Sequence, residues 1–348
     1  MKRPSRSAVR LLAVPSVAIL VSLAVACGDD DAGPTASPTP GATTPAITHE
    51  PGPWPTLAET GTWRTLASVP TPRSEVAVAE LDGLIYVIGG FNPDGSASDV
   101  VEVYDPSTDS WSDAAPLPEP RHHAAAAGLG GKLYVIGGFN PGFADPHATV
   151  FLYSPADDSW GTAAAMPTPR GGLAAAVLDG RIYAAGGSGS VGAQTAFEVY
   201  DPAADSWSTL AAMPTGRDHL ALAAAGGKLF AIGGRVNVDY GRNLDANEEY
   251  DPATDKWVAR APLRTARSGI AAAVLGDRIY VFGGEGTGGT FDENEVYDPA
   301  ADAWETGPPM PTARHGLGAA DSGGVIYVLG GGPTPGLSVS GANEAFTP

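Results

Sequence analysis

The segment FEVYDPAADSW, residues 197–207, largely decides the fold. A run rich in aromatic and β-branched residues ends at Tyr200, the pair Asp201-Pro202 follows, and Trp207 comes seven residues after the tyrosine. Proline presets the backbone for a tight turn, and the aspartate before it can accept hydrogen bonds from nearby amides. The segment therefore predicts two short strands joined by a turn. Close copies at 101–111 (VEVYDPSTDSW) and 247–257 (NEEYDPATDKW) indicate a repeat.

The repeat extends over most of the chain and has a nearly constant length. Tryptophans stand at 63, 111, 160, 207, 257 and 304, and Gly-Gly pairs begin at 89, 137, 186, 233, 283 and 330, so that both series advance by 48, 49, 47, 50 and 47 residues. An arginine always follows the tryptophan by 10 residues and precedes the Gly-Gly pair by 16. All variation in length therefore lies between the Gly-Gly pair and the next aromatic residue.

Each copy predicts four strands. The first is built of small apolar residues, as in GGLAAAVL, and the second is a continuous apolar run such as RIYVFGG, which is typical of a buried strand. The third carries the Glu-x-Tyr-Asp-Pro segment, and the fourth carries the tryptophan. Many glycines and prolines, 46 and 32 in the 348 residues, agree with short strands and frequent turns. No segment has sustained helical periodicity.

A period near 48 residues with Gly-Gly, tyrosine and tryptophan at fixed offsets resembles the kelch repeat, which builds β-propellers. The resemblance covers residues 61–348 and implies an all-β, six-bladed propeller whose first strands line a central channel. The second copy departs from the pattern, because Phe151 and Ser154 replace the usual glutamate and aspartate.

The last copy, GANEAFTP at 341–348, has Phe346 in place of the tyrosine and no tryptophan after it. Six tryptophan strands and six Gly-Gly strands balance only if Trp63 belongs to the last blade. We therefore predict that GTWRTLASVP, residues 61–70, supplies the missing strand and closes the ring, which leaves no open gap between the first and last blades.

The first 60 residues differ from the repeats. Residues 1–26 have a basic start and an apolar run too short for a membrane-spanning helix, which predicts a signal peptide. The sequence LAVAC, which ends at Cys27, resembles the lipobox of bacterial lipoproteins; the alternative is a plain secretory signal with an incidental cysteine. The resemblance implies an acylated Cys27, an extracytoplasmic protein held on a membrane by its lipid, and a flexible Pro/Thr-rich tether over 27–60.

The charge balance limits the classes of partner. The formal net charge is −19 and becomes −23 once the four basic residues of the first 26 are removed. Such an acidic protein is not expected to bind nucleic acid, or to bind anionic lipid through a basic patch. We therefore expect contact with a membrane only through the lipid.

The variable loops predict the binding surface. A uniform scaffold whose length varies at one position directs that variation to one face of the propeller. The residues in these loops that interrupt the repeat are ligand-binding candidates: Arg235, Asp239, Tyr240 and Arg242 in the longest loop, and Asn92, Asp94, Asn140, His147, Glu285 and Asp292 in the others.

Six repeated arginines enter the same face: Arg73, Arg121, Arg170, Arg217, Arg267 and Arg314. A ring of guanidinium groups can bind carboxylates or anionic sugars. A residue present in every blade can equally be structural, with the glutamate two positions before the tyrosine as its partner. Because Phe151 stands at that position while Arg121 persists, we do not expect strict one-to-one pairing.

No catalytic or cofactor motif emerges from the sequence. His122, His123, His219 and His315 follow the arginines by one or two positions and can approach one another, but they lie on separate blades without short-range ligand spacing. We therefore predict histidines of the rim or channel wall, and neither a metal site nor a cofactor. GEGTGG at 284–289 matches a dinucleotide-binding pattern but leads into another strand, so no helix follows to hold a pyrophosphate.

Two functional hypotheses follow. The first is a lipid-anchored module that binds a protein, peptide or glycan through its loop face. The second is an enzyme that resembles the kelch-type sialic-acid epimerase (mutarotase), which needs only a pocket arginine for the carboxylate and an acid/base such as Glu285. Copper radical oxidases on kelch-like propellers need a cysteine crosslinked to tyrosine, and the sole cysteine, Cys27, lies outside the repeats. A closed-bottom pocket that joins Arg, Glu and His would favour the enzyme; a broad open surface would favour the binding module.

Overall fold

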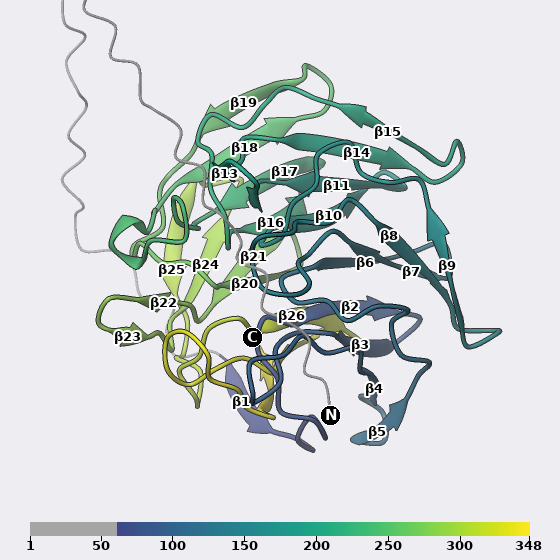
Figure 1. The fold of residues 1–348 in the computed structure, drawn as a ribbon. Helices are drawn as coiled ribbons and strands as arrows, with labels where there is room; N and C mark the ends of the chain where they lie inside the picture. The colour runs from purple at the N-terminus through teal and green to yellow at the C-terminus, as the bar shows by residue number, and fades with distance from the viewer. Residues whose placement is uncertain (1–60) are drawn as a thin grey trace, which may run out of the picture. The chain divides into compact units, whose positions relative to one another are not determined.

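The computed structural model describes residues 61–348, which form six four-stranded antiparallel sheets arranged around a central axis (Figure 1). This arrangement confirms the predicted six-bladed all-β propeller. The predictions for the signal peptide, Cys27 and the tether fall outside the described residues. Within 61–348, no helix is long and apolar enough to cross a membrane.

In every blade the strands run in order from the axis to the rim. The first three blades are β2 (Ala77–Leu81), β3 (Leu84–Ile88), β4 (Val101–Asp105) and β5 (Ser110–Asp113); β6 (Ala125–Leu129), β7 (Lys132–Ile136), β8 (Val150–Ser154) and β9 (Ser159–Ala163); and β10 (Ala174–Leu178), β11 (Arg181–Ala185), β14 (Phe197–Asp201) and β15 (Ser206–Thr209). The last three are β16 (Ala221–Ala225), β17 (Lys228–Ile232), β18 (Asn247–Asp251) and β19 (Lys256–Ala259); β20 (Ala271–Leu275), β21 (Arg278–Phe282), β24 (Asn294–Asp298) and β25 (Ala303–Thr306); and β26 (Gly318–Ser322), β27 (Val325–Leu329), β28 (Asn343–Thr347) and β1 (Thr62–Thr65).

Short elements decorate the loops between the second and third strands. The loops of blades 3 and 5 form small hairpins, β12 (Ser188–Gly189) with β13 (Gly192–Ala193) and β22 (Glu285–Gly286) with β23 (Gly289–Thr290). The longest loop, in blade 4, contains the 3-10 helix η1 (Tyr240–Arg242). We call the face that carries these loops, together with the loops leading to the inner strands, the loop face.

The inner strands are rich in alanine and glycine because six of them meet around the axis. A side chain at Gly128 of β6, for example, would collide with the backbone of Glu80 in β2 of the neighbouring blade. The larger apolar residues pack between blades instead. Each of six buried clusters joins two neighbouring sheets, as where Ile88 of β3 packs with Phe151 of β8. The hydrophobic core is therefore a ring of interfaces between the blades, and every blade depends on both neighbours.

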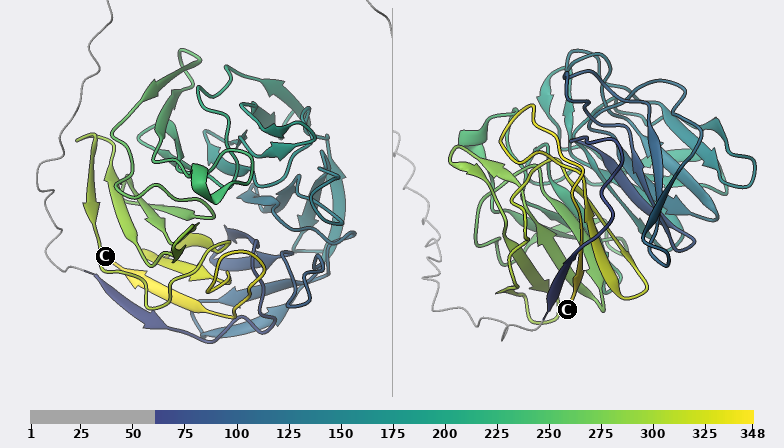
Figure 2. Two further views of the ribbon diagram at one scale, coloured as in Figure 1. Left: turned by 60° about the vertical axis from the view of Figure 1, so that its left-hand side comes forward. Right: turned by 90° about the horizontal axis from the view of Figure 1, so that it is seen from below.

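The ring closes as the sequence predicts. Strand β1 pairs antiparallel with β28, with Trp63 opposite Phe346, so that the last sheet combines the two ends of the described chain. Figure 2 shows this N-terminal strand beside the C-terminal strands at the rim. The rings of Trp63 and Phe346 lie 5.0 Å apart, and the Trp63 indole donates to the carbonyl of Pro308 in the preceding blade, at 3.0 Å.

A repeated polar contact, which we call the rim latch, ties each of the first five blades to the blade before it. In blade 1, Asp109 Oδ1 accepts from the Tyr104 hydroxyl at 2.8 Å and from the backbone N–H of Ala67 at 2.9 Å, while the Trp111 indole donates to the Ala67 carbonyl. The aspartate has a φ of 50°, a left-handed conformation that Asp adopts more readily than most residues. This geometry explains the spacing of Tyr, Asp and Trp with which the sequence analysis began.

Candidate functional site

The six repeated arginines lie inside the blades. Each side chain is buried, and five of them form an ion pair with the glutamate of the same blade: Arg73–Glu102, Arg170–Glu198, Arg217–Glu248, Arg267–Glu295 and Arg314–Glu344, at 2.5–2.8 Å. They also donate to backbone carbonyls, as Arg73 Nη1 does to Gly89 at 2.7 Å. The arginines thereby hold the loops from which the site is built.

Blade 2 is the exception that the sequence indicates. Phe151 occupies the glutamate position, and the Arg121 guanidinium carbon lies 5.2 Å from the centre of its ring. Arg121 instead pairs with the exposed Glu119 at 2.7 Å and contacts His147 Nδ1 at 3.1 Å. One guanidinium is thus stabilised by an aromatic face and a surface carboxylate in place of a buried ion pair.

The second residue after each arginine belongs to a closed ring of hydrogen bonds around the axis. Each donates its backbone N–H to the carbonyl of the equivalent residue in the preceding blade, at 2.7–3.1 Å; in order, the six are Glu75, His123, Gly172, His219, Gly269 and Gly316, and Glu75 donates to Gly316. All six have positive φ, between 53° and 65°. Glycine adopts this conformation freely, whereas a residue with a side chain is strained there.

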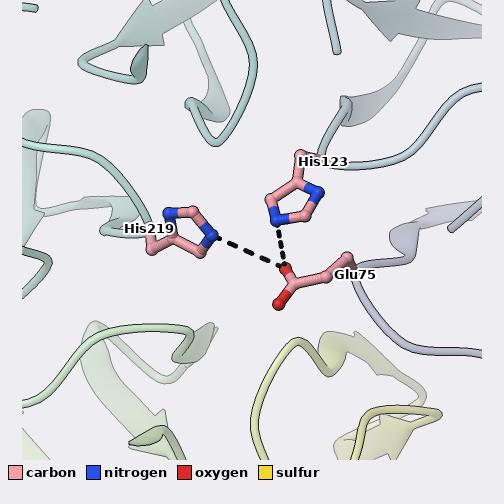
Figure 3. Close-up of side chains that lie close together, drawn as sticks. All are labelled: Glu75, His123 and His219. Atoms are coloured by element: carbon pink, nitrogen blue, oxygen red, sulfur yellow. Dashed lines mark ion pairs between the residues drawn. The ribbon is translucent and has the colours of Figure 1, made fainter. Parts of the chain in front are cut away.

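Three positions of this ring carry side chains despite that strain, and the three converge. Figure 3 shows the Glu75 carboxylate between the imidazoles of His123 and His219. Glu75 Oε2 lies 3.4 Å from His123 Nε2 and 4.0 Å from His219 Nε2. Backbone strain of this kind persists where the surrounding structure enforces it, and it is concentrated at functional sites. The cluster therefore marks the centre of the loop face as the candidate site.

A second group of charged residues adjoins Glu75. His315 Nδ1 lies 3.3 Å from Glu75 Oε1 and 3.4 Å from Glu285 Oε2. Arg235 Nη1 pairs with Glu285 Oε1 at 2.6 Å, and its Nη2 donates to His219 Nε2 at 2.9 Å. His219 in turn donates from Nδ1 to Asp218 Oδ1 at 2.7 Å. These residues and His123 form one network, which we call the polar floor: Glu75, His123, Asp218, His219, Arg235, Glu285 and His315.

The polar floor changes the pKa values of Glu75 and His315. Burial raises the pKa of Glu75, but the histidines around it, His123, His315 and His219, outweigh burial and bring this pKa well below its usual value. For His315, burial lowers the pKa, and the carboxylates of Glu75 and Glu285 reverse the effect, so that the net shift is upward. The floor thus favours negative charge on Glu75 and positive charge at His315 Nδ1.

A cavity of about 310 Å³ opens above the polar floor on the loop face. Its walls are apolar and come from the loops of four blades: Phe91, Phe143, Val238, Tyr240 and Leu337. Its base includes Glu75, His123, Arg235, Glu285 and His315. A smaller chamber of about 90 Å³ inside the channel also contacts Glu75 and His123, so the polar floor lies between the cavity and the channel.

The structure divides the candidates found from the sequence. Arg235, Tyr240 and Glu285 line the cavity, whereas none of the six repeated arginines does. The remaining loop candidates, none of which lines this cavity, serve local structure or point to solvent. Asp239 accepts from Gly241 N–H in η1, Asp94 and Asn92 bond to Ser96, His147 contacts the Asn140 carbonyl, and Arg242 and Asp292 are exposed. Cys27 lies outside the described residues.

Sequence reasoning missed Glu75, Phe91, Phe143 and Leu337 as site residues. It named His123 and His315 only as residues near the channel. A signal for Glu75 exists: aligned on the repeated arginines, the second following residue is Glu, His, Gly, His, Gly and Gly in successive copies. A charged residue at a position that glycine occupies in three copies indicates a role other than folding.

Comparison with known proteins agrees with this architecture. The kelch motif model matches five consecutive segments, residues 72–118, 120–167, 169–214, 216–264 and 266–311. A solved structure titled "Structure of YjhT" superposes with a TM-score of 0.68 at 20% identity, covering 81% of this chain and 97% of that one. No curated protein sequence matches the chain significantly. With matched segments that span well over half of its residues, the chain belongs to the kelch-motif family.

Proposed function

We propose that this protein is a binding module that takes one unit of a peptide or glycan into the loop-face cavity. One observation carries the proposal. Of the five large hydrophobic side chains that are conspicuously exposed in residues 61–348, three line this one cavity: Phe143, Val238 and Leu337, at 50%, 39% and 70% exposure. Exposed apolar side chains gathered at a concave site are typical of ligand recognition.

The chemistry of the cavity fits a ligand with both a ring or apolar body and polar groups. Phe143, which is half exposed, offers a ring on which a sugar or an apolar side chain can stack, and Phe91 and Tyr240 add aromatic surface to the wall. The polar floor supplies hydrogen-bonding groups at the base. A volume of about 310 Å³ lies at the lower end of the range for small-ligand sites, roughly 300–1,000 Å³. The cavity therefore suits a single residue or sugar unit of a larger ligand.

An array experiment tests this proposal. The purified protein is applied to glycan and peptide arrays, and hits are measured in solution by calorimetry. Phe143→Ala and Leu337→Ala should each weaken binding, by roughly 10-fold for the loss of one apolar contact of 1–2 kcal/mol. Val258→Ala is the matched control, since Val258 is 51% exposed on β19 and lies away from the cavity. Equal effects of all three substitutions, or no ligand on either array, would contradict the proposal.

A carbohydrate-active enzyme is the second candidate, because the cavity joins Arg235, Glu285 and His315 in its lining. In this arrangement Glu285 or Glu75 would serve as the acid/base, and Arg235 would hold a substrate carboxylate. Arg235, however, is already engaged by Glu285 and Asp218, so a substrate carboxylate would have to displace one of them. The equilibration of sialic-acid anomers, followed by NMR, distinguishes the candidates: acceleration that Glu285→Gln abolishes supports the enzyme.

We further propose that Cys27 carries the lipid that holds the protein on the outer side of a bacterial membrane. The support is the LAVAC sequence that ends at this residue and the preceding apolar run. The protein expressed in bacteria should incorporate radiolabelled palmitate and partition into detergent, and Cys27→Ser should abolish both. Label that persists in the substituted protein would place the lipid elsewhere.

A further inference from the structure

Three residues of the polar floor, Glu75, Glu285 and His315, bring potential metal-binding atoms together. Their donor atoms, one from each residue, all lie within 4.8 Å of one another, and all three residues line the loop-face cavity. Glu285 and His315 are 1% exposed. Neither the six arginines nor the apolar walls of the cavity account for this convergence, which brings residues of blades 1, 5 and 6 together.

His315 is oriented so that its Nδ1 atom can coordinate a metal ion. Its Nε2 lies 3.1 Å from the carbonyl oxygen of Thr334, and because a carbonyl only accepts, Nε2 carries the proton in that contact. Nδ1 therefore carries either the proton that the neighbouring carboxylates favour or, in the neutral ring, a lone pair that a metal ion can take in place of that proton. Within residues 61–348 this buried atom has no well-formed hydrogen bond. A backbone carbonyl that fixes the tautomer of a histidine from behind is the usual outer partner of a metal-binding imidazole.

The distances around Nδ1 match a shared ion. The Nδ1 atom lies 3.3 Å from Glu75 Oε1 and 3.4 Å from Glu285 Oε2. Two donors that each lie about 2.05 Å from a tetrahedral metal are separated by roughly 3.3 Å. We propose that Glu75, Glu285 and His315 bind one divalent transition-metal ion of the Zn²⁺ type, with its open position directed into the cavity.

The charges of the floor agree with a divalent ion. The polar floor holds three carboxylates, those of Glu75, Glu285 and Asp218, and one guanidinium, that of Arg235. Once the ion takes the place of the proton on His315 Nδ1, two negative charges are left to be balanced. Buried charge without a partner is costly, and a divalent cation balances both. Arg235 bonds to Glu285 Oε1. Glu285 Oε2 accepts from the Gly336 N–H at 3.2 Å and keeps a second lone pair for the ion.

The neighbouring trio of Glu75, His123 and His219 is the less suitable site. Its atoms also lie within 4.8 Å of one another, but His219 Nε2 already accepts from Arg235 Nη2 at 2.9 Å. An ion on that nitrogen would have to displace the arginine and would then lie beside its positive charge. We therefore assign the metal ion to the trio that contains His315, and substitutions can distinguish it from the trio that contains His219.

Direct metal binding tests the inference, and it does not depend on any ligand of the cavity. The purified protein is stripped with a chelator, dialysed, and titrated with Zn²⁺ by calorimetry; Co²⁺ is added to a second sample and its visible spectrum recorded. We expect one equivalent of Zn²⁺, a higher melting temperature in its presence, and the intense bands of tetrahedral Co²⁺. Absence of stoichiometric binding overturns the proposal.

Substitutions locate the ion. His315→Gln and Glu75→Gln should each weaken Zn²⁺ binding by more than the roughly 10–100-fold that follows loss of an outer partner. His147→Gln, in the blade-2 loop and outside the lining of the cavity, should not change Zn²⁺ binding, and circular dichroism confirms that each variant is folded. His123→Gln discriminates between the trios: unchanged affinity supports the His315 site. Loss of binding in His123→Gln with retention in His315→Gln overturns it, as does retention in both His315→Gln and Glu75→Gln.

Discussion

Glu75 donates its backbone N–H to the carbonyl of Gly316 at 2.7 Å, and this contact completes the ring of six hydrogen bonds around the axis. The two residues occupy the same position in blades 1 and 6, both with positive φ. Gly316 also leaves the space that Glu75 needs, because a Cβ at Gly316 would lie 2.6 Å from Glu75 Oε1. One position of the repeat thus supports folding in one blade and provides a functional group in another.

The ring of backbone hydrogen bonds predicts that glycine is tolerated better than alanine at position 123. With a φ of 57°, His123→Gly should be more stable than His123→Ala by about 1 kcal/mol, because alanine in the left-handed region is strained. Both variants lose the imidazole, so the difference isolates the backbone. Urea denaturation measures it. At Ala124, where φ is not positive, Ala124→Gly should instead destabilise by about 0.5–1 kcal/mol, and the same sign at both positions would refute the argument.

The buried ion pairs predict a contrast between blades 2 and 3. Glu198 is the one carboxylate that pairs with Arg170 within residues 61–348, and Glu198→Ala should cost about 3–5 kcal/mol, because a buried guanidinium is left uncompensated. Glu119→Ala removes the partner of Arg121, but Glu119 is 59% exposed, so the cost should be at most about 1 kcal/mol. Denaturant unfolding of the two variants under the same conditions gives the comparison. Equal losses would mean that Phe151 does not stabilise Arg121.

The closing sheet predicts cooperative loss of the propeller. Deleting residues 61–70, which include β1, or 341–348, which include β28, should unfold all six blades together, because each interface depends on two complete neighbours. Trp63→Ala should cost about 3 kcal/mol, since its ring packs on Phe346 and Phe282. Thermal unfolding followed by circular dichroism is the measurement. A deletion variant that melts like the intact protein would contradict the closure.

The rim latches predict that the folded protein becomes less stable in acid. The pKa of Asp158 is lowered by hydrogen bonds from the Tyr153 hydroxyl and then the Ala115 amide, and that of Asp205 by those from Ala164 and Tyr200. A carboxyl whose pKa is lower in the folded state stabilises it above the unfolded value, near 3.8, and loses that contribution as pH falls through the folded value. The free energy of unfolding should therefore decrease below about pH 4. Asp158→Asn keeps an acceptor without the titration and should flatten this decrease; an unchanged pH profile would exclude the latch as its source.

The architecture could be predicted because each constraint is local and occurs repeatedly. Trp207, Tyr200 and Asp205 fix one turn and one contact between blades, and the same spacing recurs around the ring. Closure followed from the same count, since Trp63 had no other strand to join. The rim latch itself was not predicted, because the sequence does not show which backbone amide the aspartate reaches.

The site could be predicted only in part. Arg235 and Glu285 were candidates because they interrupt the repeat in the variable loops, and they line the cavity. Glu75 was missed because it lies in the constant segment beside Arg73, where variation was not expected. Its meeting with Glu285 and His315 depends on how three distant blades converge at the axis. Asp239 and Asp94 also interrupt the repeat, yet their carboxylates are used by their own turns.

The direction of β1 shows on which face of the propeller the described chain begins. Thr62 lies opposite Thr347, at the end of β28 away from the variable loops, and the chain then runs along β1 and onward to Arg73 at the loop face. The described chain therefore begins, at Gly61, on the side of the propeller opposite the cavity. The cavity and the start of the described chain thus lie on opposite faces of the propeller, so a large partner can approach the cavity without meeting β1.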